Sequence, residues 1–191
     1  MLIGVLSDTH QPNDRQTIWD ELHAAFKGVD LILHGGDIHA PGILDALQEI
    51  APVIAARGNH DVGWNDRRMK AVQFVDVEGL RIGITHAIEP ENRPIDVLRR
   101  MYYKDEALDI MVSGDSHIER LDYRSGVLQM NPGSPTLSHH QSTRLGTVGL
   151  IDIGPDRRVE ARIVRIGETA GKKNPGVEFS FTPETGVVCL G

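Results

Sequence analysis

The 191-residue sequence has little cysteine, little basic charge and no long apolar run. Its single cysteine, Cys189, excludes a disulfide within the chain and a thiolate metal cluster. No apolar run approaches the roughly 18 residues that a membrane-spanning helix needs, so no membrane partner is expected. Lys and Arg number 20 against 27 Asp and Glu, and this balance argues against a basic nucleic-acid-binding surface. The start, MLIGVLSDTH, predicts a strand rather than a signal peptide, so we expect a soluble cytoplasmic protein.

The first third of the chain alternates apolar runs with amphipathic stretches. This pattern predicts strands at residues 2–6, 31–33 and 53–56, and helices at residues 15–27 and 41–50. The resulting β-α-β-α-β order favours parallel strands with crossover helices.

The rest of the chain is richer in strand patterns separated by Gly and Asp turns. Strands are predicted at residues 72–77, 80–85, 110–113, 118–123, 127–130, 147–153 and 159–164, with a helix at residues 94–103. We expect a mixed α/β (α+β) fold, a four-layer α-β-β-α sandwich of two packed mixed sheets. Residues 1–166 form one domain in this interpretation. Residues 167–191 form an extension with a weak terminal hairpin, packed on that domain or partly flexible.

The pattern Asp-x-His occurs three times, each time after a predicted strand: at Asp8-Thr9-His10, Asp37-Ile38-His39 and Asp115-Ser116-His117. In open α/β sheets ligands bind at the carboxyl ends of the strands, so polar residues that follow different strands gather at one edge. The candidate metal ligands at these ends are Asp8, His10, Asp37, Asn59, His86, Asp115 and His117. Such a set is too large for one catalytic ion and fits two ions that share a carboxylate.

Several of these segments together resemble the calcineurin-like metallophosphoesterases, and the order agrees from residue 1 to about residue 135. The resemblance rests on D-x-H at Asp8, G-D at Asp37, G-N-H-D at residues 58–61, a strand-end His86 and G-x-x-H ending at His117. The chain's small size and the segment Asn131-Pro132-Gly133-Ser134 are similar to the compact bacterial and archaeal phosphodiesterases of that superfamily.

The resemblance implies a metallo-dependent phosphatase fold and a role for each ligand. One ion would be held by Asp8, His10 and His117, and the other by Asn59, His86 and the residue at 115, with Asp37 as the bridge. A hydroxide between the ions would attack phosphorus. His60 would be the general acid, with Asp61 as its orienting partner. Asn59, His60 and, more weakly, Arg57 would contact the substrate.

One position departs from the family, which usually has histidine where this chain has Asp115. If Asp115 binds metal, it makes the ligand set more negative and richer in oxygen, which favours hard ions. We therefore expect two divalent ions, Mn²⁺ first, with Fe, Zn, Ni or Mg as alternatives. The other reading is that the shorter Asp side chain leaves the second ion weakly bound.

Some residues have both a structural and a functional interpretation. Asp61 could instead cap a helix, and Arg57 could form a structural ion pair. His39 has no family role, and we expect it to be exposed. The segment SHHQST, with His139 and His140, is expected to be a polar loop, with access to the active site as the alternative.

The leading functional hypothesis is a metal-dependent phosphoric ester hydrolase that cleaves a phosphodiester, with a small-molecule or nucleotide substrate. The diester preference rests on family analogy alone. One alternative is a phosphomonoesterase or nucleotidase at the same site. The other is a non-catalytic protein-binding scaffold with a decayed metal site, as in the metallophosphoesterase-like subunit of retromer. A homo-oligomer remains open.

Overall fold

The computed structural model describes residues 1–11, 18–141 and 145–191. Its larger sheet contains β1 (Leu2–Leu6), β2 (Leu31–His34), β3 (Val53–Ala56), β4 (Met69–Lys70), β10 (Thr147–Ile153), β11 (Val159–Arg165), β12 (Phe179–Thr182) and β13 (Gly186–Cys189). The smaller sheet contains β5 (Val72–Val77), β6 (Leu80–Thr85), β7 (Ile110–Val112), β8 (Glu119–Arg124) and β9 (Val127–Pro132).

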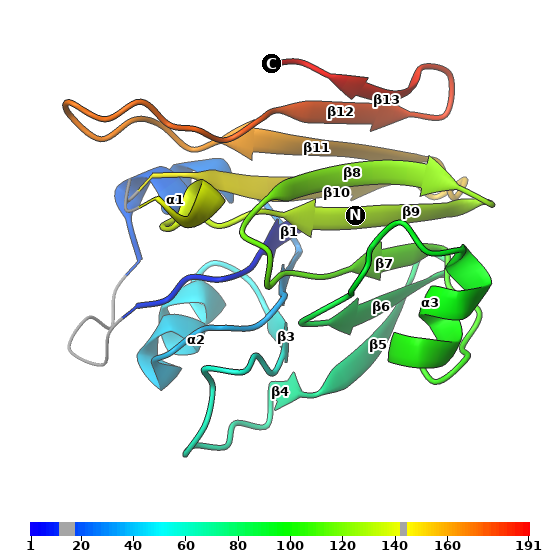
Figure 1. The fold of residues 1–191 in the computed structure, drawn as a ribbon, viewed down its shortest axis with the longest axis horizontal. Coiled ribbons are helices and arrows are strands. Elements are labelled where there is room, and N and C mark those ends of the chain that lie inside the picture. The colour runs from blue at the N-terminus through cyan, green and yellow to red at the C-terminus, as the bar shows by residue number, and fades with distance from the viewer. Residues whose placement is uncertain (12–17, 142–144) are drawn as a thin grey trace.

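Both sheets are mixed, as the sequence predicts (Figure 1). The larger runs in the order β13-β12-β11-β10-β1-β2-β3-β4, and the smaller in the order β5-β6-β7-β9-β8. Strands β1, β2 and β3 are parallel neighbours, and so are β6, β7 and β9. Because parallel strands end at the same edge, each sheet brings several strand-end loops together.

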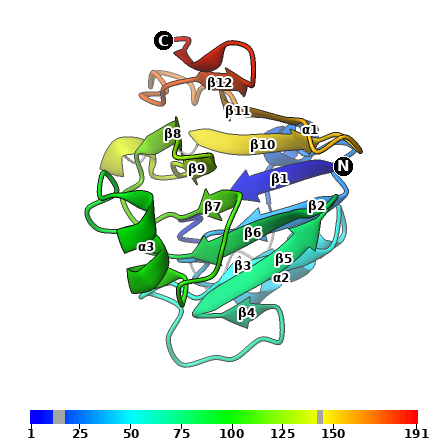
Figure 2. The same cartoon turned by 90° about the vertical axis from the view of Figure 1, so that its right-hand side faces the viewer.

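Helices cover the outer face of each sheet and complete the expected four layers (Figure 2). Helices α1 (Asp20–Ala25) and α2 (Pro41–Gln48) pack on the larger sheet, and α3 (Ile95–Tyr102) packs on the smaller one. A third apolar cluster lies between the two sheets and includes Val5, Leu33, Ile84 and Val112. Residues in β2 are buried on both faces, which explains its continuous apolar run, Leu-Ile-Leu.

The predicted helices and the terminal hairpin are found with shifted limits. Helix α1 begins later than expected, and residues 15–17 of the predicted helix lie outside the described residues. The terminal hairpin is confirmed: β12 pairs with β11, and β13 turns back on β12. Phe181 of β12 is buried and contacts Tyr123 of β8, so this tail packs against both sheets. Among the helices that the structure describes, none has the length and apolar character to cross a membrane.

Candidate metal site at the carboxyl ends of the strands

The three Asp-x-His segments follow β1, β2 and β7 and meet where the two sheets adjoin. The first two run side by side, since the amide of Asp8 donates to the carbonyl of Gly36 (2.9 Å) and that of His10 to the carbonyl of Asp37 (3.1 Å). The third joins them through the amide of Asp115, which donates to Asp8 Oδ2 (3.0 Å). Residues from three distant parts of the sequence therefore share one small volume.

All six Asp and His residues of these segments have the left-handed backbone conformation. Their φ angles are +56° and +42° at Asp8 and His10, +56° and +71° at Asp37 and His39, and +71° and +55° at Asp115 and His117. A left-handed conformation is unfavourable for residues with a Cβ, although Asp and His tolerate it better than most. Strained residues of this kind cluster at functional sites when the surrounding structure holds them in place.

A buried carboxylate, Asp61, holds the second segment. Its Oδ1 accepts the amides of Ile38 (2.8 Å) and His39 (3.0 Å), and its Oδ2 accepts those of Asp37 (3.0 Å) and Gly58 (2.8 Å). Both oxygens are thus committed to backbone amides, and the contacts of the described residues include none from Asp61 to the His60 ring. These contacts give Asp61 a role in shaping the loop, and its role as the orienting partner of His60 stays a prediction.

The segment Asn131-Pro132-Gly133-Ser134 holds the other two Asp-x-His segments, those of Asp8 and Asp115. Asn131 Nδ2 donates to the carbonyl of Gly114 (2.8 Å), just before Asp115, and Ser134 Oγ donates to the carbonyl of Asp8 (2.7 Å). No role for this motif could be predicted from the sequence. In the structure it connects the loop of Asp8 to the loop of Asp115.

Two glycines allow the loops to approach so closely. A Cβ at Gly58 would lie 2.0 Å from Asp37 Oδ1, and one at Gly114 would lie 1.8 Å from Ser7 Oγ. Any larger residue at either place would displace a candidate ligand loop.

The first group of donor atoms that could hold an ion comes from Asp8, His10 and His117. Asp8 Oδ1 lies 3.9 Å from His10 Nε2 and 3.6 Å from His117 Nε2. The two imidazole Nε2 atoms are 3.0 Å apart. Asp8 Oδ1 is buried and has no hydrogen-bond partner, which is costly for a carboxylate oxygen unless a cation meets it. These residues fit a divalent ion.

The second group lies on the other side of Asp37. His86 Nε2 is 3.4 Å from Asp37 Oδ1, 2.9 Å from Asn59 Oδ1 and 3.3 Å from Asp115 Oδ1. Asp8, Asp37 and His86 together form a second set of atoms that could hold an ion. Asp37 faces both groups, because its Oδ2 lies 3.6 Å from His10 Nε2. Asp115, which stands where the family usually has histidine, therefore reaches the second group of donor atoms.

Burial and neighbouring charges shift the pKa of several of these groups. Burial raises the pKa of Asp8 to about 7, against the attraction of His86. Burial opposes ionisation of Asp37 too, but hydrogen bonds from His86 and from the His60 amide lower its pKa to about 2. Burial disfavours protonated His86, yet its hydrogen bond to Asp37 and the charge of Asp8 raise its pKa to about 9. Burial lowers the pKa of His10 to about 4 and also lowers that of His117.

Other histidines surround the two groups. His39 is partly buried, and its ring lies 4.8 Å from that of His10 and 5.0 Å from that of His60, so the expectation that it is exposed is wrong. His60 is half-exposed at the open side, with Nε2 3.8 Å from Asp37 Oδ2. His140 stacks on His117 at 4.5 Å. Of the expected polar loop, residues 142–144 lie outside the described residues, but His139 and His140 reach the site.

Sequence reasoning missed a buried carboxylate, Glu119, that anchors this histidine turn. Glu119 accepts hydrogen bonds from His139 Nε2 (2.6 Å), Ser138 Oγ (3.2 Å) and Thr147 Oγ1 (2.6 Å). The amide of His139 donates in turn to the carbonyl of His117 (3.0 Å). In the sequence, Glu119 is an ordinary residue of a predicted strand, and no nearby pattern indicates that it would bind the turn at His139.

Arg57 contacts oxygens of its own loop, and its weak substrate contact stays a prediction. Its guanidinium donates to the carbonyls of Asp61 (3.5 Å) and Trp64 (3.3 Å) and to Asn65 Oδ1 (2.9 Å). These contacts support a structural role, although through carbonyl and amide oxygens rather than the ion pair considered from sequence.

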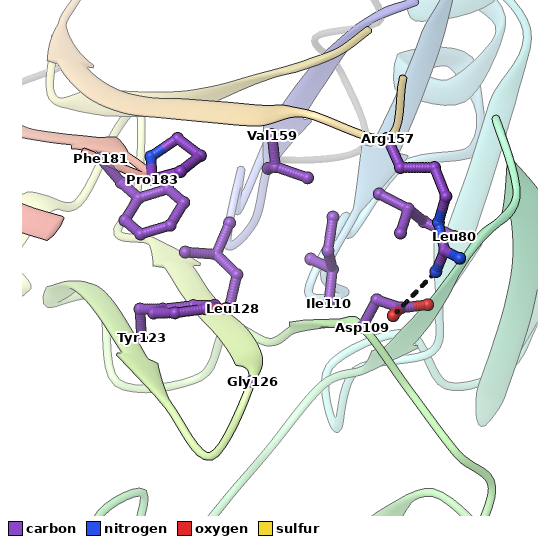
Figure 3. Close-up of a pocket in the computed structure, with 10 residues that line it drawn as sticks. All are labelled: Leu80, Asp109, Ile110, Tyr123, Gly126, Leu128, Arg157, Val159, Phe181 and Pro183. Carbon is purple, nitrogen blue, oxygen red and sulfur yellow. Dashed lines mark ion pairs between the residues drawn. The ribbon is translucent and has the colours of Figure 1, made fainter. Parts of the chain in front are cut away.

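A separate hollow of about 180 Å³ lies at the opposite end of the strands (Figure 3). Leu80, Ile110 and Leu128, at the starts of β6, β7 and β9, line it together with Phe181, and an ion pair of 3.6 Å joins Arg157 to Asp109. Of the residues that line it, none is a candidate metal ligand.

Comparison with known proteins agrees with this chemistry. The model of the calcineurin-like phosphoesterase superfamily domain matches residues 1–156. A probable metallophosphoesterase of Methanothermobacter thermautotrophicus is 33% identical over 170 residues, which cover 87% of this chain and 94% of that protein. Vps29 of Entamoeba histolytica, solved with Zn²⁺, is 18% identical with a TM-score of 0.68, covering 99% and 97% of the two chains. A structure described as a novel archaeal phosphodiesterase is 22% identical with a TM-score of 0.60, covering 86% and 100%.

Fold and site together define a metallophosphoesterase with candidate ligands for divalent ions. The chain belongs to the calcineurin-like phosphoesterase superfamily.

The pKa values of Asp8 and His86 predict that metal binding depends on pH. A proton on Asp8 below about pH 7 and a proton on His86 below about pH 9 both compete with an ion, whereas His10 is already neutral above about pH 4. Affinity for Mn²⁺ should therefore rise with pH, by up to about tenfold per pH unit for each proton displaced. Calorimetric titration between about pH 6 and pH 8, in buffers of different protonation enthalpy, measures the affinity and the protons released.

The matched control is His23→Ala, which removes an exposed histidine of α1 and should leave the pH dependence unchanged. Affinity that is flat across this range, with no proton released, would contradict the assignment of Asp8 and His86 as groups that the ion displaces from their protons.

Proposed function

We propose that this chain is a dinuclear metal-dependent phosphoesterase that hydrolyses a phosphodiester bond. The observation that carries the proposal is the pair of donor groups that meet at the buried, unpartnered Asp8 Oδ1: Asp8, His10 and His117 form one, and Asp8, Asp37 and His86 the other. Asp37 faces His10 of the first group with one oxygen and His86 of the second with the other. Two sites that share a carboxylate are the arrangement used for in-line displacement at phosphorus. Membership of the superfamily supports the same reaction class.

In this proposal each ligand has a stated place. Asp8, His10 and His117 hold one ion, and Asn59, His86 and Asp115 hold the other. Asp37 is the bridge, because its two oxygens face His10 and His86 separately. When bound, the two ions supply Lewis-acid polarisation of the phosphoryl group and lower the pKa of water.

His60 is the proposed general acid. Its ring stands at the open side of Asp37 and is 54% exposed, so it can reach the leaving oxygen of a substrate held there. Its amide donates to Asp37 Oδ1 (2.9 Å), which fixes its backbone relative to the proposed bridge. The proton that leaves with the product oxygen comes from the imidazole and is replaced from solvent. Asn59 and His60 are the proposed substrate contacts.

The charges around the site favour a diester over a monoester. Among the described residues, the groups that act most strongly on the pKa values of Asp8, Asp37 and the three ligand histidines are histidines and carboxylates, with no Lys or Arg. Arg57 is turned toward backbone carbonyls. A monoester carries a second negative charge, and none of these strongest described neighbours is a Lys or Arg that could receive it.

The likeness to Vps29 fits a second function, a protein-binding scaffold with a decayed metal site. Against it stand the buried, unpartnered Asp8 Oδ1 and the presence of His60 at the open side. A scaffold needs neither, because a buried carboxylate without a cation only destabilises the fold.

Asp37→Ala tests the dinuclear proposal, with wild type and the exposed-carboxylate variant Asp96→Ala as controls. Because Asp37 holds both groups together, its removal should lower the bound Mn²⁺ and abolish turnover at the same time. Metal content is measured by elemental analysis, and rates are measured with bis(4-nitrophenyl) phosphate and 4-nitrophenyl phosphate. Wild type should prefer the diester.

The other outcomes separate the alternatives. A wild-type preference for the monoester would support the phosphomonoesterase. Metal binding without hydrolysis of either ester would support the scaffold. Full activity with two ions retained in Asp37→Ala would rule out the bridging role.

His60→Ala should leave metal content unchanged and slow diesters of poor leaving groups most, by about 10²–10⁴-fold. Nitrophenyl leaving groups need little protonation, so their esters should lose less. The measurement is kcat/KM across a series of aryl and alkyl diesters. An equal loss for all leaving groups would point to phosphate binding instead of acid catalysis.

Asp115→Ala tests whether the residue that departs from the family is a ligand. Since Asp115 Oδ1 lies 3.3 Å from His86 Nε2, its removal should weaken one ion and spare the one on Asp8, His10 and His117. Mn²⁺ titration should change from two sites to one tight and one weak site, while Asp96→Ala keeps both. Unchanged affinity for both ions would place Asp115 outside the ligand set.

A further inference from the structure

The three candidate ligand histidines present the same ring atom to the site. His10, His86 and His117 each direct Nε2 toward the carboxylates and Nδ1 away from them. A histidine can bind an ion through Nε2 only if its proton is on Nδ1, and the partner of Nδ1 decides this tautomer.

Two of the three outer partners are backbone carbonyls. His86 Nδ1 is 2.8 Å from the carbonyl of Gly35, and His117 Nδ1 is 3.2 Å from that of Leu137. A carbonyl only accepts, so both rings carry a proton on Nδ1, and in the neutral form of each ring Nε2 is the atom left for an ion. His10 differs, because its Nδ1 lies 3.3 Å from Nε2 of another histidine, His39.

The fold places His39 for this contact. Its amide donates to the buried Asp61 Oδ1, and its left-handed backbone matches that of His10 in the neighbouring segment. The two rings meet edge to face at 4.8 Å and 83°. The partly buried His39 ring also lies against His60, with centroids 5.0 Å apart.

We propose that His39 is a positioning residue for the metal ligand His10: its neutral Nε2 accepts the hydrogen bond from His10 Nδ1. His39 then carries its own proton on Nδ1. The reverse direction would put the proton of a neutral His10 on Nε2, the atom that faces Asp8, Asp37 and His117, and would remove His10 as a ligand.

This inference rests on the proposed metal site but not on the reaction, so it is tested without substrate. The variants are His39→Ala, which removes the acceptor, and His39→Gln, whose amide oxygen can accept in its place. His39→Gln also guards against a backbone effect of alanine at a left-handed position. His23→Ala is the matched control, since it removes an exposed histidine elsewhere.

Zn²⁺, a diamagnetic ion, is the probe. Competition with a chromophoric chelator measures its affinity. In His39→Ala the affinity of one of the two ions should fall by about 10–100-fold, and His39→Gln should recover most of it. Long-range ¹H–¹⁵N correlation of ¹⁵N-histidine protein, with His10 assigned by its loss in His10→Gln, should show the Nδ1–H tautomer in wild type and its weakening in His39→Ala.

The failures are distinguishable. If wild type binds two Zn²⁺ ions and His39→Ala binds them with the same affinities and the same His10 tautomer, this inference alone is overturned. If His39→Gln loses as much affinity as His39→Ala, acceptance of the hydrogen bond is not the role of His39. If wild type binds no Zn²⁺, both the proposed function and this inference fall.

Discussion

The left-handed backbone of the three Asp-x-His segments is the constraint on which the site depends. Each segment follows a strand, and both its Asp and its His have a positive φ angle, so the chain turns sharply there. Six residues in this conformation each cost about 1–2 kcal/mol relative to a relaxed backbone. Buried hydrogen bonds offset the strain: Asp61 holds the second segment, while Asn131 and Ser134 hold the third and the first. The strand ends bring the segments together, and these polar side chains keep them in register.

Charge in the site follows from the same geometry. Close packing buries Asp8 so that its pKa rises to about 7, while Asp37 keeps a pKa of about 2 through hydrogen bonds with its neighbours. Two carboxylates in one site thus differ because Asp37 accepts hydrogen bonds from His86 and the His60 amide, whereas Asp8 Oδ1 is buried with no partner. The protonated form of His86 partly compensates this negative charge. A divalent ion would replace these protons, so ion and proton compete for the same atoms.

Strand positions, the two-sheet architecture and the gathering of the candidate ligands at the strand ends could be predicted from the sequence, because periodicity and turn residues act locally. The roles of His39, Asp61 and Glu119 could not. His39 meets His10 only because β1 and β2 are adjacent in the sheet, and Asp61 reaches across from the loop after β3. Glu119 looks like an ordinary strand residue until the turn at His139 folds over it. In each case the deciding contact is between segments about 20 residues or more apart, where no local pattern specifies a partner.

The fold alone does not separate an enzyme from a scaffold, since solved structures under 25% identical share it. What separates them is where the polar side chains point. A scaffold gains from exposed side chains on an outer surface, and it gains nothing from strained residues that turn carboxylates and imidazoles inward. In this chain the inward set is continuous: His39 contacts His10, His10 contacts His117, and His140 stacks on His117. His10, His86 and His117 each have a partner on the outer side of the ring, whereas Asp8 Oδ1 has none on its inner side. This asymmetry supports the proposed metal site over the protein-binding scaffold.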